Sequence, residues 1–271
     1  MPPTKQLIID AHCHAGHGER SPGHWATYAA PEIILRHMGE AGIDRSILFP
    51  LESQEYAKAN QEVAEICRRR PGKFIGFARH DPQAEGDRIP EMLAHEVKDL
   101  GLKGLKVSKL PTRGVLEAVS KLGIPVIYHA ERTVTFNMMA QEFPNTPFIV
   151  AHMGSHIFNW GEHIVAIDLA RRFPNVYLDT SQVAFFKLLE MAVREAGAGK
   201  LIFGSDGPEF DSRAELYKIK LLKLSPADEA RVLGGNIQRL LPKGISLSLS
   251  GPFSTTARDK LKLIPPGIPG D

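Results

Sequence analysis

The stretch LIIDAHCHAGHG, residues 7–18, begins as an apolar run typical of a buried strand and ends in two histidines one residue apart. Because side chains alternate between the two faces of a strand, we expect His12 and His14 to project the same way. Asp10 is expected on that face and Cys13 on the other. A doubly wound sheet would more often carry a glycine-rich fingerprint after its first strand, where this chain has histidines. This stretch alone is compatible with two interpretations: the histidines are two ligands of a metal site, or they are a pair of surface histidines beside a turn.

The rest of the chain repeats one pattern, an apolar run followed by an amphipathic segment. The segment PEIILRHMGEAG, residues 31–42, combines a helical period with proline at its first position and glycine at its end. Strands that alternate with helices predict βαβ units and a parallel sheet. Eight such units over about 235 residues match a (β/α)₈ TIM barrel of the α/β class better than a doubly wound sheet. The apolar runs lie near residues 7, 46, 74, 104, 126, 148, 176 and 201.

The last part of the chain differs from the repeated units. Residues 225–241, SPADEARVLGGNIQRLL, predict a helix with Ser225 at its amino-terminal cap. From residue 243 onward, proline and glycine interrupt an alternating stretch. We therefore expect the barrel to occupy residues 1–242, with residues 243–271 as a C-terminal extension outside it.

Composition and charge narrow the class of protein. The chain has 271 residues, a net charge of +2, 43% hydrophobic residues and two cysteines. So small a net charge does not favour binding to nucleic acid or to an acidic membrane. The sequence contains no run of about 18 apolar residues, so no membrane span is predicted. Two cysteines far apart favour a reducing compartment over a disulfide framework. These features predict a soluble cytoplasmic protein with a small-molecule substrate.

Polar residues end several of the apolar runs. His129, His152 and Asp206 end the fifth, sixth and eighth runs. The carboxyl ends of barrel strands emerge on one face, so these residues should meet His12 and His14 there. Each alone is compatible with a core histidine or a turn aspartate. Five together predict a metal centre, because imidazole nitrogen and carboxylate oxygen are ligands of divalent metals.

These residues resemble the amidohydrolase superfamily. The similar segments are IDAHCH, HMG, FGSDGP and LGGNIQRLL. They look like its amidohydrolase-related branch of metal-dependent hydrolases and of decarboxylases of the aminocarboxymuconate-semialdehyde and resorcylate type. The resemblance implies a TIM barrel with one divalent metal, usually Zn²⁺, with Mn²⁺ or Fe²⁺ as alternatives. It implies metal ligands at His12, His14, His129 and Asp206, with His152 as an acid/base or electrophile. Relatives of this kind commonly form dimers, so a homodimer is also open.

Two reactions fit this residue set. The first is hydrolysis, in which metal-activated water attacks an amide, ester or lactone bond and His152 and Asp206 act as catalytic residues. The alternative is decarboxylation of a small unsaturated or aromatic acid. Candidate substrate-binding residues are Arg79, His80, Lys106 and Trp25.

Other interpretations carry less support from the residues. A second metal would need a bridging ligand, for which Lys103 and Lys106 are candidates. A metal-dependent DNase would want an acidic ligand on the fourth strand, where none is present. A noncatalytic metal- or metabolite-binding barrel is a further alternative, although none of the five site residues is missing. Asp179, at the end of the seventh run, is a candidate hydrogen-bond partner of a ligand imidazole.

Overall fold

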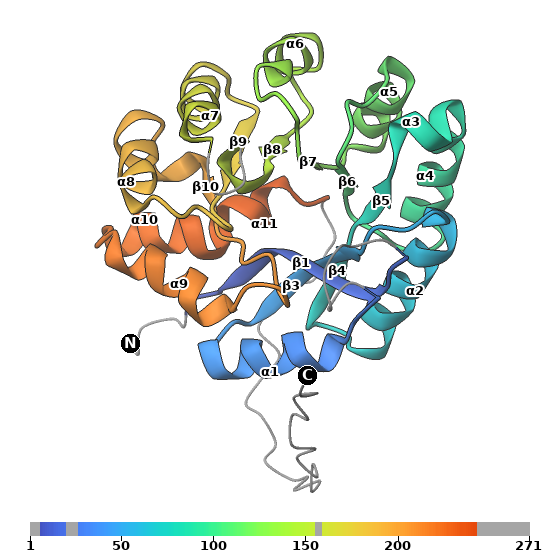
Figure 1. Cartoon of the computed structure of the whole chain (residues 1–271), viewed down its shortest axis with the longest axis horizontal. Helices are drawn as coiled ribbons and strands as arrows, with labels where there is room; N and C mark the ends of the chain where they lie inside the picture. The colour runs from blue at the N-terminus through green and yellow to red at the C-terminus, as the bar shows by residue number, and fades with distance from the viewer. Residues whose placement is uncertain (1–5, 20–26, 155–158, 243–271) are drawn as a thin grey trace, which may run out of the picture.

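The computed structural model describes residues 6–19, 27–154 and 159–242, and within them eight parallel strands form a barrel ringed by helices (Figure 1). The third strand of the barrel is interrupted at Phe77 and so consists of two pieces, β4 and β5. At the break, Phe77 N donates to Leu48 O on one side and Ala78 N donates to Gly104 O on the other. The barrel closes through the backbone, because Ala11 N donates to Phe203 O at 2.9 Å and His14 N donates to Gly207 O at 2.7 Å. The predicted α/β TIM barrel is confirmed. Its strands are β1 (Ile9–His17), β3 (Arg45–Pro50), β4 and β5 (Phe74–Gly76 and Ala78–His80), β6 (Leu105–Val107), β7 (Val126–Tyr128), β8 (Phe148–Val150), β9 (Val176–Asp179) and β10 (Leu201–Ile202).

Helices follow the strands in the predicted order. The first begins at Pro31 and ends before Gly42, whose φ of 73° is the left-handed conformation that glycine adopts readily. Ser225 caps α10 through its hydroxyl group, as predicted. A short strand β2 (Tyr28–Ala29) pairs antiparallel with β1. The helices are α1 (Pro31–Ala41), α2 (Tyr56–Arg69), α3 (Pro82–Glu85), α4 (Ile89–Lys98), α5 (Arg113–Leu122), α6 (Thr135–Glu142), α7 (Trp160–Arg172), α8 (Phe186–Glu195), α9 (Ser212–Leu221), α10 (Pro226–Ala230) and α11 (Asn236–Leu240).

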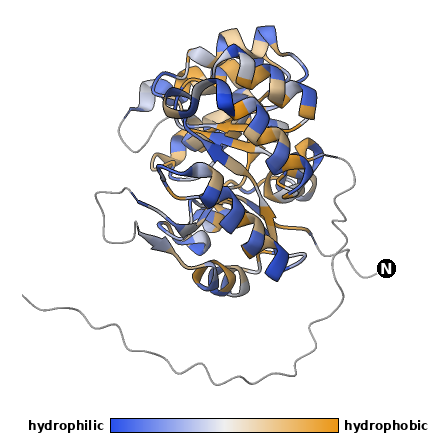
Figure 2. Cartoon of the chain, turned by 90° about the vertical axis from the view of Figure 1, so that its right-hand side faces the viewer, coloured by the Kyte–Doolittle hydropathy of each residue, from blue (hydrophilic) through white to orange (hydrophobic). Residues whose placement is uncertain are grey.

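The apolar core has two layers. The larger layer lies between the strands and the surrounding helices, so hydrophobic residues gather inside and hydrophilic ones outside (Figure 2). The smaller layer fills the barrel itself, and Ile237 and Leu240 of α11 belong to it together with the strand residues Ile9 and Ile47. Helix α11 therefore closes the amino end of the barrel. Polar groups inside the barrel are concentrated at the carboxyl ends of the strands.

Strand β1 departs from the regular alternation expected of it. A β-bulge between Asp10 and Cys13 shifts the register against β3. Ala11 belongs to the inner apolar layer, and His12 also faces inward, where its ring contacts Phe49. Asp10 instead accepts a hydrogen bond from Ser205 N at 2.9 Å. The expectation that Asp10 shares a face with His12 is therefore wrong, because the bulge reverses the alternation between them.

Two expectations concern residues outside the described part of the chain. The C-terminal extension, residues 243–271, and Trp25 both lie there. Within the described part, no helix combines the length and apolar character that crossing a membrane requires.

Candidate metal centre

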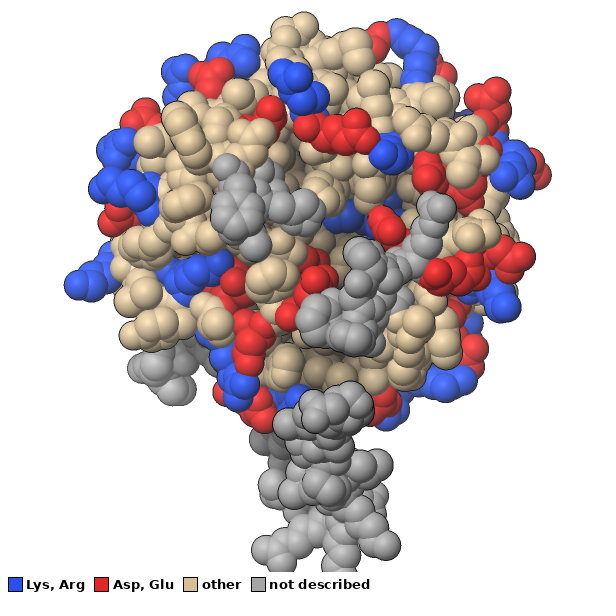
Figure 3. Space-filling model, in the orientation of Figure 1, with Lys and Arg blue, Asp and Glu red and all other residues tan. Residues whose placement is uncertain are grey.

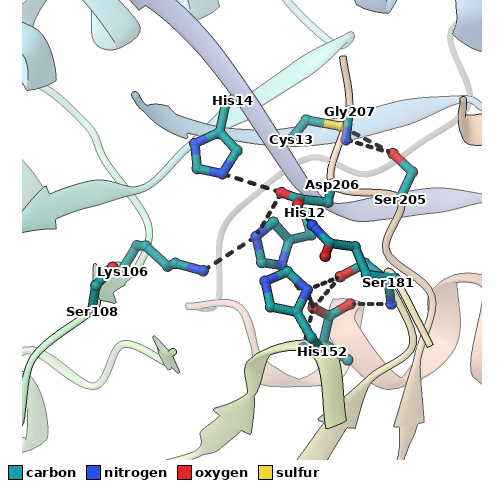
Figure 4. Close-up of polar contacts among 12 residues, drawn as sticks. His12, Cys13, His14, Lys106, Ser108, His152, Ser181, Ser205, Asp206 and Gly207 are labelled. Carbon is teal, nitrogen blue, oxygen red and sulfur yellow. Dashed lines mark hydrogen bonds and ion pairs between the residues drawn. The ribbon is translucent and has the colours of Figure 1, made fainter. Parts of the chain in front are cut away.

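Three buried residues from different strands converge at the carboxyl end of the barrel. They are His12 on β1, His152 in the turn after β8, and Asp206 in the turn after β10 (Figure 4). One ligand atom from each lies within 4.8 Å of the others. We call these three residues the metal group.

One carboxylate oxygen in this group faces two imidazole nitrogens. Oδ1 of Asp206 lies 3.3 Å from Nε2 of His12 and 3.2 Å from Nε2 of His14. This oxygen is buried, and within the described residues it accepts no hydrogen bond of acceptable geometry. A buried, ionised oxygen without a hydrogen bond is costly, so the arrangement fits a cation held between the carboxylate and the two rings. The ring centroid of His129 lies 5.0 Å from that of His152, which brings the fifth predicted residue to the same place.

Hydrogen bonds orient the imidazole rings. His12 Nδ1 lies 2.7 Å from Asp179 Oδ2, and His14 Nδ1 lies 3.1 Å from the carbonyl oxygen of Pro50. Both acceptors lack a proton, so Nδ1 of each ring is the donor and its Nε2 carries a lone pair. These Nε2 atoms are the ones that face Asp206. A neutral imidazole with this tautomer is a suitable metal ligand.

Burial and charge set the protonation states. Burial lowers the pKa of His14 to about 4 and that of His152 well below its usual value. Burial alone would raise the pKa of Asp206, but the neighbouring histidines lower it well below its ordinary range. Neutral imidazoles and an ionised carboxylate therefore coexist at neutral pH. Such a set of nitrogen and oxygen donors suits Zn²⁺ and other divalent transition metals.

The backbone at two of these positions is unusual. His152 has a φ of 52° and Asp206 a φ of 61°, both in the left-handed region that residues other than glycine rarely adopt. Each residue lies in the turn that follows a strand, and the turn aims its side chain over the barrel mouth. Strained conformations of this kind cluster at functional sites.

Two buried cations border the metal group. Lys106, on β6, places Nζ 3.2 Å from His12 Nε2, and burial together with the charge of Arg79 lowers the pKa of Lys106 to about 7. Arg79, on β5, donates from Nη1 to the same Pro50 carbonyl that holds His14. Basic and acidic side chains lie deep in a hollow near the centre of one face of the molecule (Figure 3). A neighbouring pocket of about 520 Å³ is lined by Arg79 together with Tyr56, Ser108 and Lys109, among others.

His80, another candidate substrate-binding residue, has both ring nitrogens engaged. Nδ1 lies 3.0 Å from Glu85 and Nε2 lies 2.8 Å from Glu96. Burial alone would lower the pKa of His80, but the two carboxylates raise it to about 9. The ring is therefore a buried imidazolium in an ion cluster, which favours a structural role.

Sequence reasoning found Asp179 but missed two residues that follow it. Ser181 lies beside His152, and Gln182 donates a hydrogen bond to Asp206 Oδ2. The available signal is the polar run DTSQ, residues 179–182, directly after an apolar strand. Such runs are also typical of ordinary turns, so the sequence gives no reason to choose these residues.

Comparisons with solved structures show the same fold. A 2,6-dihydroxybenzoate decarboxylase from Rhizobium superposes with a TM-score of 0.70 at 19% identity, covering 87% of this chain and 98% of that one. A 5-carboxyvanillate decarboxylase from Sphingomonas paucimobilis gives 0.68 at 15% identity, covering 87% and 99%. A dihydroxybenzoic acid decarboxylase from Polaromonas, with bound manganese and the inhibitor 2-nitroresorcinol, gives 0.70 at 18% identity, covering 87% and 97%. At these identities the likeness establishes the fold alone.

The family is established by a sequence comparison. No curated protein gives a match to the chain. The amidohydrolase family model, however, matches residues 9–243, which include every strand of the barrel and all five converging residues. The fold, the divalent metal site and this match lead to one conclusion: the chain belongs to the amidohydrolase family.

Proposed function

We propose that this protein is a metal-dependent decarboxylase acting on a small aromatic or unsaturated acid. The observation that carries the proposal is the position of Lys106, whose Nζ is buried 3.2 Å from His12 Nε2. A divalent cation and an ammonium group together exceed the single negative charge of Asp206 beside them, and a buried site screens charge poorly, so a further anion is favoured there. A substrate carboxylate supplies that anion. A neutral amide, ester or lactone does not.

The comparisons support the same choice. The three solved structures described above are decarboxylases of aromatic acids by their names, and one of them holds manganese. Of the two reactions predicted from the sequence, decarboxylation is therefore favoured over hydrolysis. Mn²⁺ joins Zn²⁺ as a first candidate for the metal.

Each residue takes a role that follows from its position. His12, His14, His129 and Asp206 would hold one divalent ion, which supplies positive charge that polarises the oxygens of the acid. Lys106 holds the substrate carboxylate through its ammonium group. His152, the third member of the metal group, would offer Nε2 as a further ligand of that ion, because its Nδ1 is bonded to Ser181. A bridging role for Lys106 in a second metal site and a substrate contact for Arg79 stay predictions.

The reaction needs one proton. As CO₂ leaves, the electron pair of the broken carbon–carbon bond forms a new carbon–hydrogen bond. We assign the proton to the ammonium form of Lys106, whose Nζ lies 3.2 Å from His12 Nε2. Solvent then returns a proton to the lysine, so that the substrate carboxylate and one proton become the decarboxylated product and CO₂ with no oxidant or reductant.

The reaction class can be tested directly. The protein, loaded with Mn²⁺ or with Zn²⁺, is incubated with carboxyl-labelled dihydroxybenzoates and other hydroxylated aromatic and enoic acids, and labelled CO₂ is measured. A parallel panel holds esters, lactones and amides. We expect CO₂ release from at least one acid. Hydrolysis of a neutral compound without CO₂ release from any acid would overturn the proposal.

A lysine pair separates the role of Lys106 from general effects of charge. Lys106→Met should lower kcat/KM for CO₂ release at least about 100-fold, equivalent to about 3 kcal/mol of transition-state stabilisation, while metal still binds. Lys103→Met is the matched control, since Lys103 lies three positions earlier and, among the described residues, its side chain makes no hydrogen bond or ion pair, while its backbone N–H donates to Gly76 O at 2.8 Å. Equal activity of the two variants would contradict the assignment.

A further inference from the structure

The segment Asp179–Gln182, at the carboxyl end of β9, contacts every member of the metal group. Those members come from three other places in the chain, β1 and the turns after β8 and β10. Asp179 Oδ2 lies 2.7 Å from His12 Nδ1, and it also accepts a hydrogen bond from the backbone N–H of His152 at 3.1 Å. One carboxylate thus connects two of the strand ends.

Ser181 extends this connection to the ring of His152. Its hydroxyl group donates to Asp179 Oδ2 at 2.6 Å, which commits its only proton. The hydroxyl oxygen of Ser181 lies 2.8 Å from His152 Nδ1, so Ser181 is the acceptor in this contact and His152 Nδ1 is the donor. The chain of hydrogen bonds therefore leaves the lone pair of His152 on Nε2, as in His12.

Gln182 supplies the third contact. Its side-chain amide donates to Asp206 Oδ2, which leaves Oδ1 to face the two histidine nitrogens. Gln182 has a φ of 58°, and its backbone N–H donates to Glu215 Oε2 of α9 at 3.1 Å. The adjoining carbonyl of Val183 accepts from Lys218 at 3.1 Å. Helix α9 thereby holds the backbone whose side chain orients Asp206.

Packing leaves little freedom to the carboxylate at the centre of this arrangement. A Cβ atom on Gly204 would lie 2.3 Å from Asp179 Oδ1 and 2.9 Å from the Cβ of His12. The absence of a side chain at position 204 is therefore what allows Asp179 to reach His12. Asp179 itself is 1% exposed, so water does not compete for its oxygens.

We propose that Asp179–Gln182 is the positioning element of the metal centre, in which Asp179 orients His12, Ser181 orients His152 and Gln182 orients Asp206. These residues act through the metal group and do not touch the substrate. The inference rests on the metal centre of the proposed function and not on its reaction. Hydrogen-bond partners of metal ligands typically change metal affinity or activity 10–100-fold when they are removed.

The experiment measures metal binding without substrate. Co²⁺ serves as the probe, because its dissociation constant and its visible absorption spectrum both report on the ligand geometry. Ser181→Ala and Gln182→Leu should each weaken Co²⁺ binding about 10–100-fold and change the spectrum. Ser181→Thr keeps the hydroxyl group and should restore most of the affinity. Ser212→Ala is the matched control, because Ser212 is also buried and its hydroxyl group has no hydrogen-bond partner within the described residues.

A second measurement uses the metal-free protein. Long-range proton–nitrogen NMR of the imidazole rings should show the Nδ1–H tautomer for His12 and His152. Ser181→Ala should disturb His152 more than His12, because Ser181 bonds His152 directly and reaches His12 only through Asp179. Unchanged Co²⁺ affinity and unchanged ring signals in both variants would overturn the inference. If Co²⁺ binds as expected but no acid releases CO₂, the proposed function fails and this inference stands.

Discussion

The barrel holds two buried clusters of histidine and carboxylate that differ in how the imidazole rings are used. In the metal group, Nδ1 of His12 is bonded to Asp179 and its Nε2 faces Asp206 and Lys106. In the cluster at β5, His80 is bonded through both nitrogens to Glu85 and Glu96. The cluster at β5 consists of His80, Glu85, Glu96 and Asn60, and Asn60 donates to Glu96 at 2.8 Å.

The pKa values follow this difference. The two carboxylates overcome burial and raise the pKa of His80 to about 9, whereas burial lowers the pKa of His14, beside Asp206, to about 4. A protonated ring between two carboxylates is a completed ion cluster and offers no lone pair. A neutral ring with one nitrogen turned to a shared centre is a ligand. Burial of a histidine beside a carboxylate therefore does not distinguish function from structure, but the use of its second nitrogen does.

The largest expected effect concerns metal binding by the metal group. Asp206→Asn preserves the shape of the side chain and removes its charge, so we expect divalent metal to bind at least about 1,000-fold more weakly, equivalent to about 4 kcal/mol. Metal content after dialysis and titration with Mn²⁺ and Zn²⁺ measure the effect. His80→Gln should leave metal affinity unchanged. Equal losses in both variants would erase the distinction between the two clusters.

The next effect concerns stability and the cluster at β5. A pKa raised from the ordinary 6.5 to about 9 corresponds to about 3 kcal/mol of stability. Because the folded state has the higher pKa, this contribution is complete below pH 6.5 and is lost as the pH rises through 9. We therefore expect His80→Gln to lower the free energy of unfolding by about 3 kcal/mol at pH 6, and by much less at pH 10.

Urea titrations of the two proteins at pH 6, 8 and 10 give the comparison. A gap between wild type and variant that stays constant with pH would show that lost packing, and not the charge of His80, causes the destabilisation. A variant as stable as wild type at pH 6 would contradict the ion cluster itself.

Much of the fold can be predicted from the sequence because its signals are local. Eight apolar runs separated by amphipathic segments lead to the barrel, and Pro31 and Gly42 mark the ends of a helix. The interruption of the third strand at Phe77 is not predictable in this way. It depends on the ring of Phe77 packing over Gly104 of the next strand, where a Cβ atom would lie 2.3 Å from that ring.

The candidate site likewise has features that can be predicted from the sequence and features that cannot. The convergence of His12, His152 and Asp206 follows from strand order, since the carboxyl ends of parallel strands share one face of the barrel. The orientation of Asp10 and the contacts of Ser181 do not follow. A bulge in β1 reverses the orientation of Asp10, and the contact of Ser181 is a hydrogen bond to His152, which follows another strand. Neither leaves a periodic pattern in the chain.

The smallest effect is expected at a third histidine–carboxylate pair, on the surface. His95 and Asp99 lie one helical turn apart, 2.6 Å between Nδ1 and Oδ2, and their side chains are 62% and 65% exposed. Water and salt screen such a pair, so His95→Gln should change the free energy of unfolding by less than about 0.5 kcal/mol. The same urea titration, run beside His80→Gln at pH 6, measures both. An effect as large as that of His80→Gln would mean that hydrogen bonding to a carboxylate, and not burial of the pair, determines the stability that a histidine contributes in this barrel.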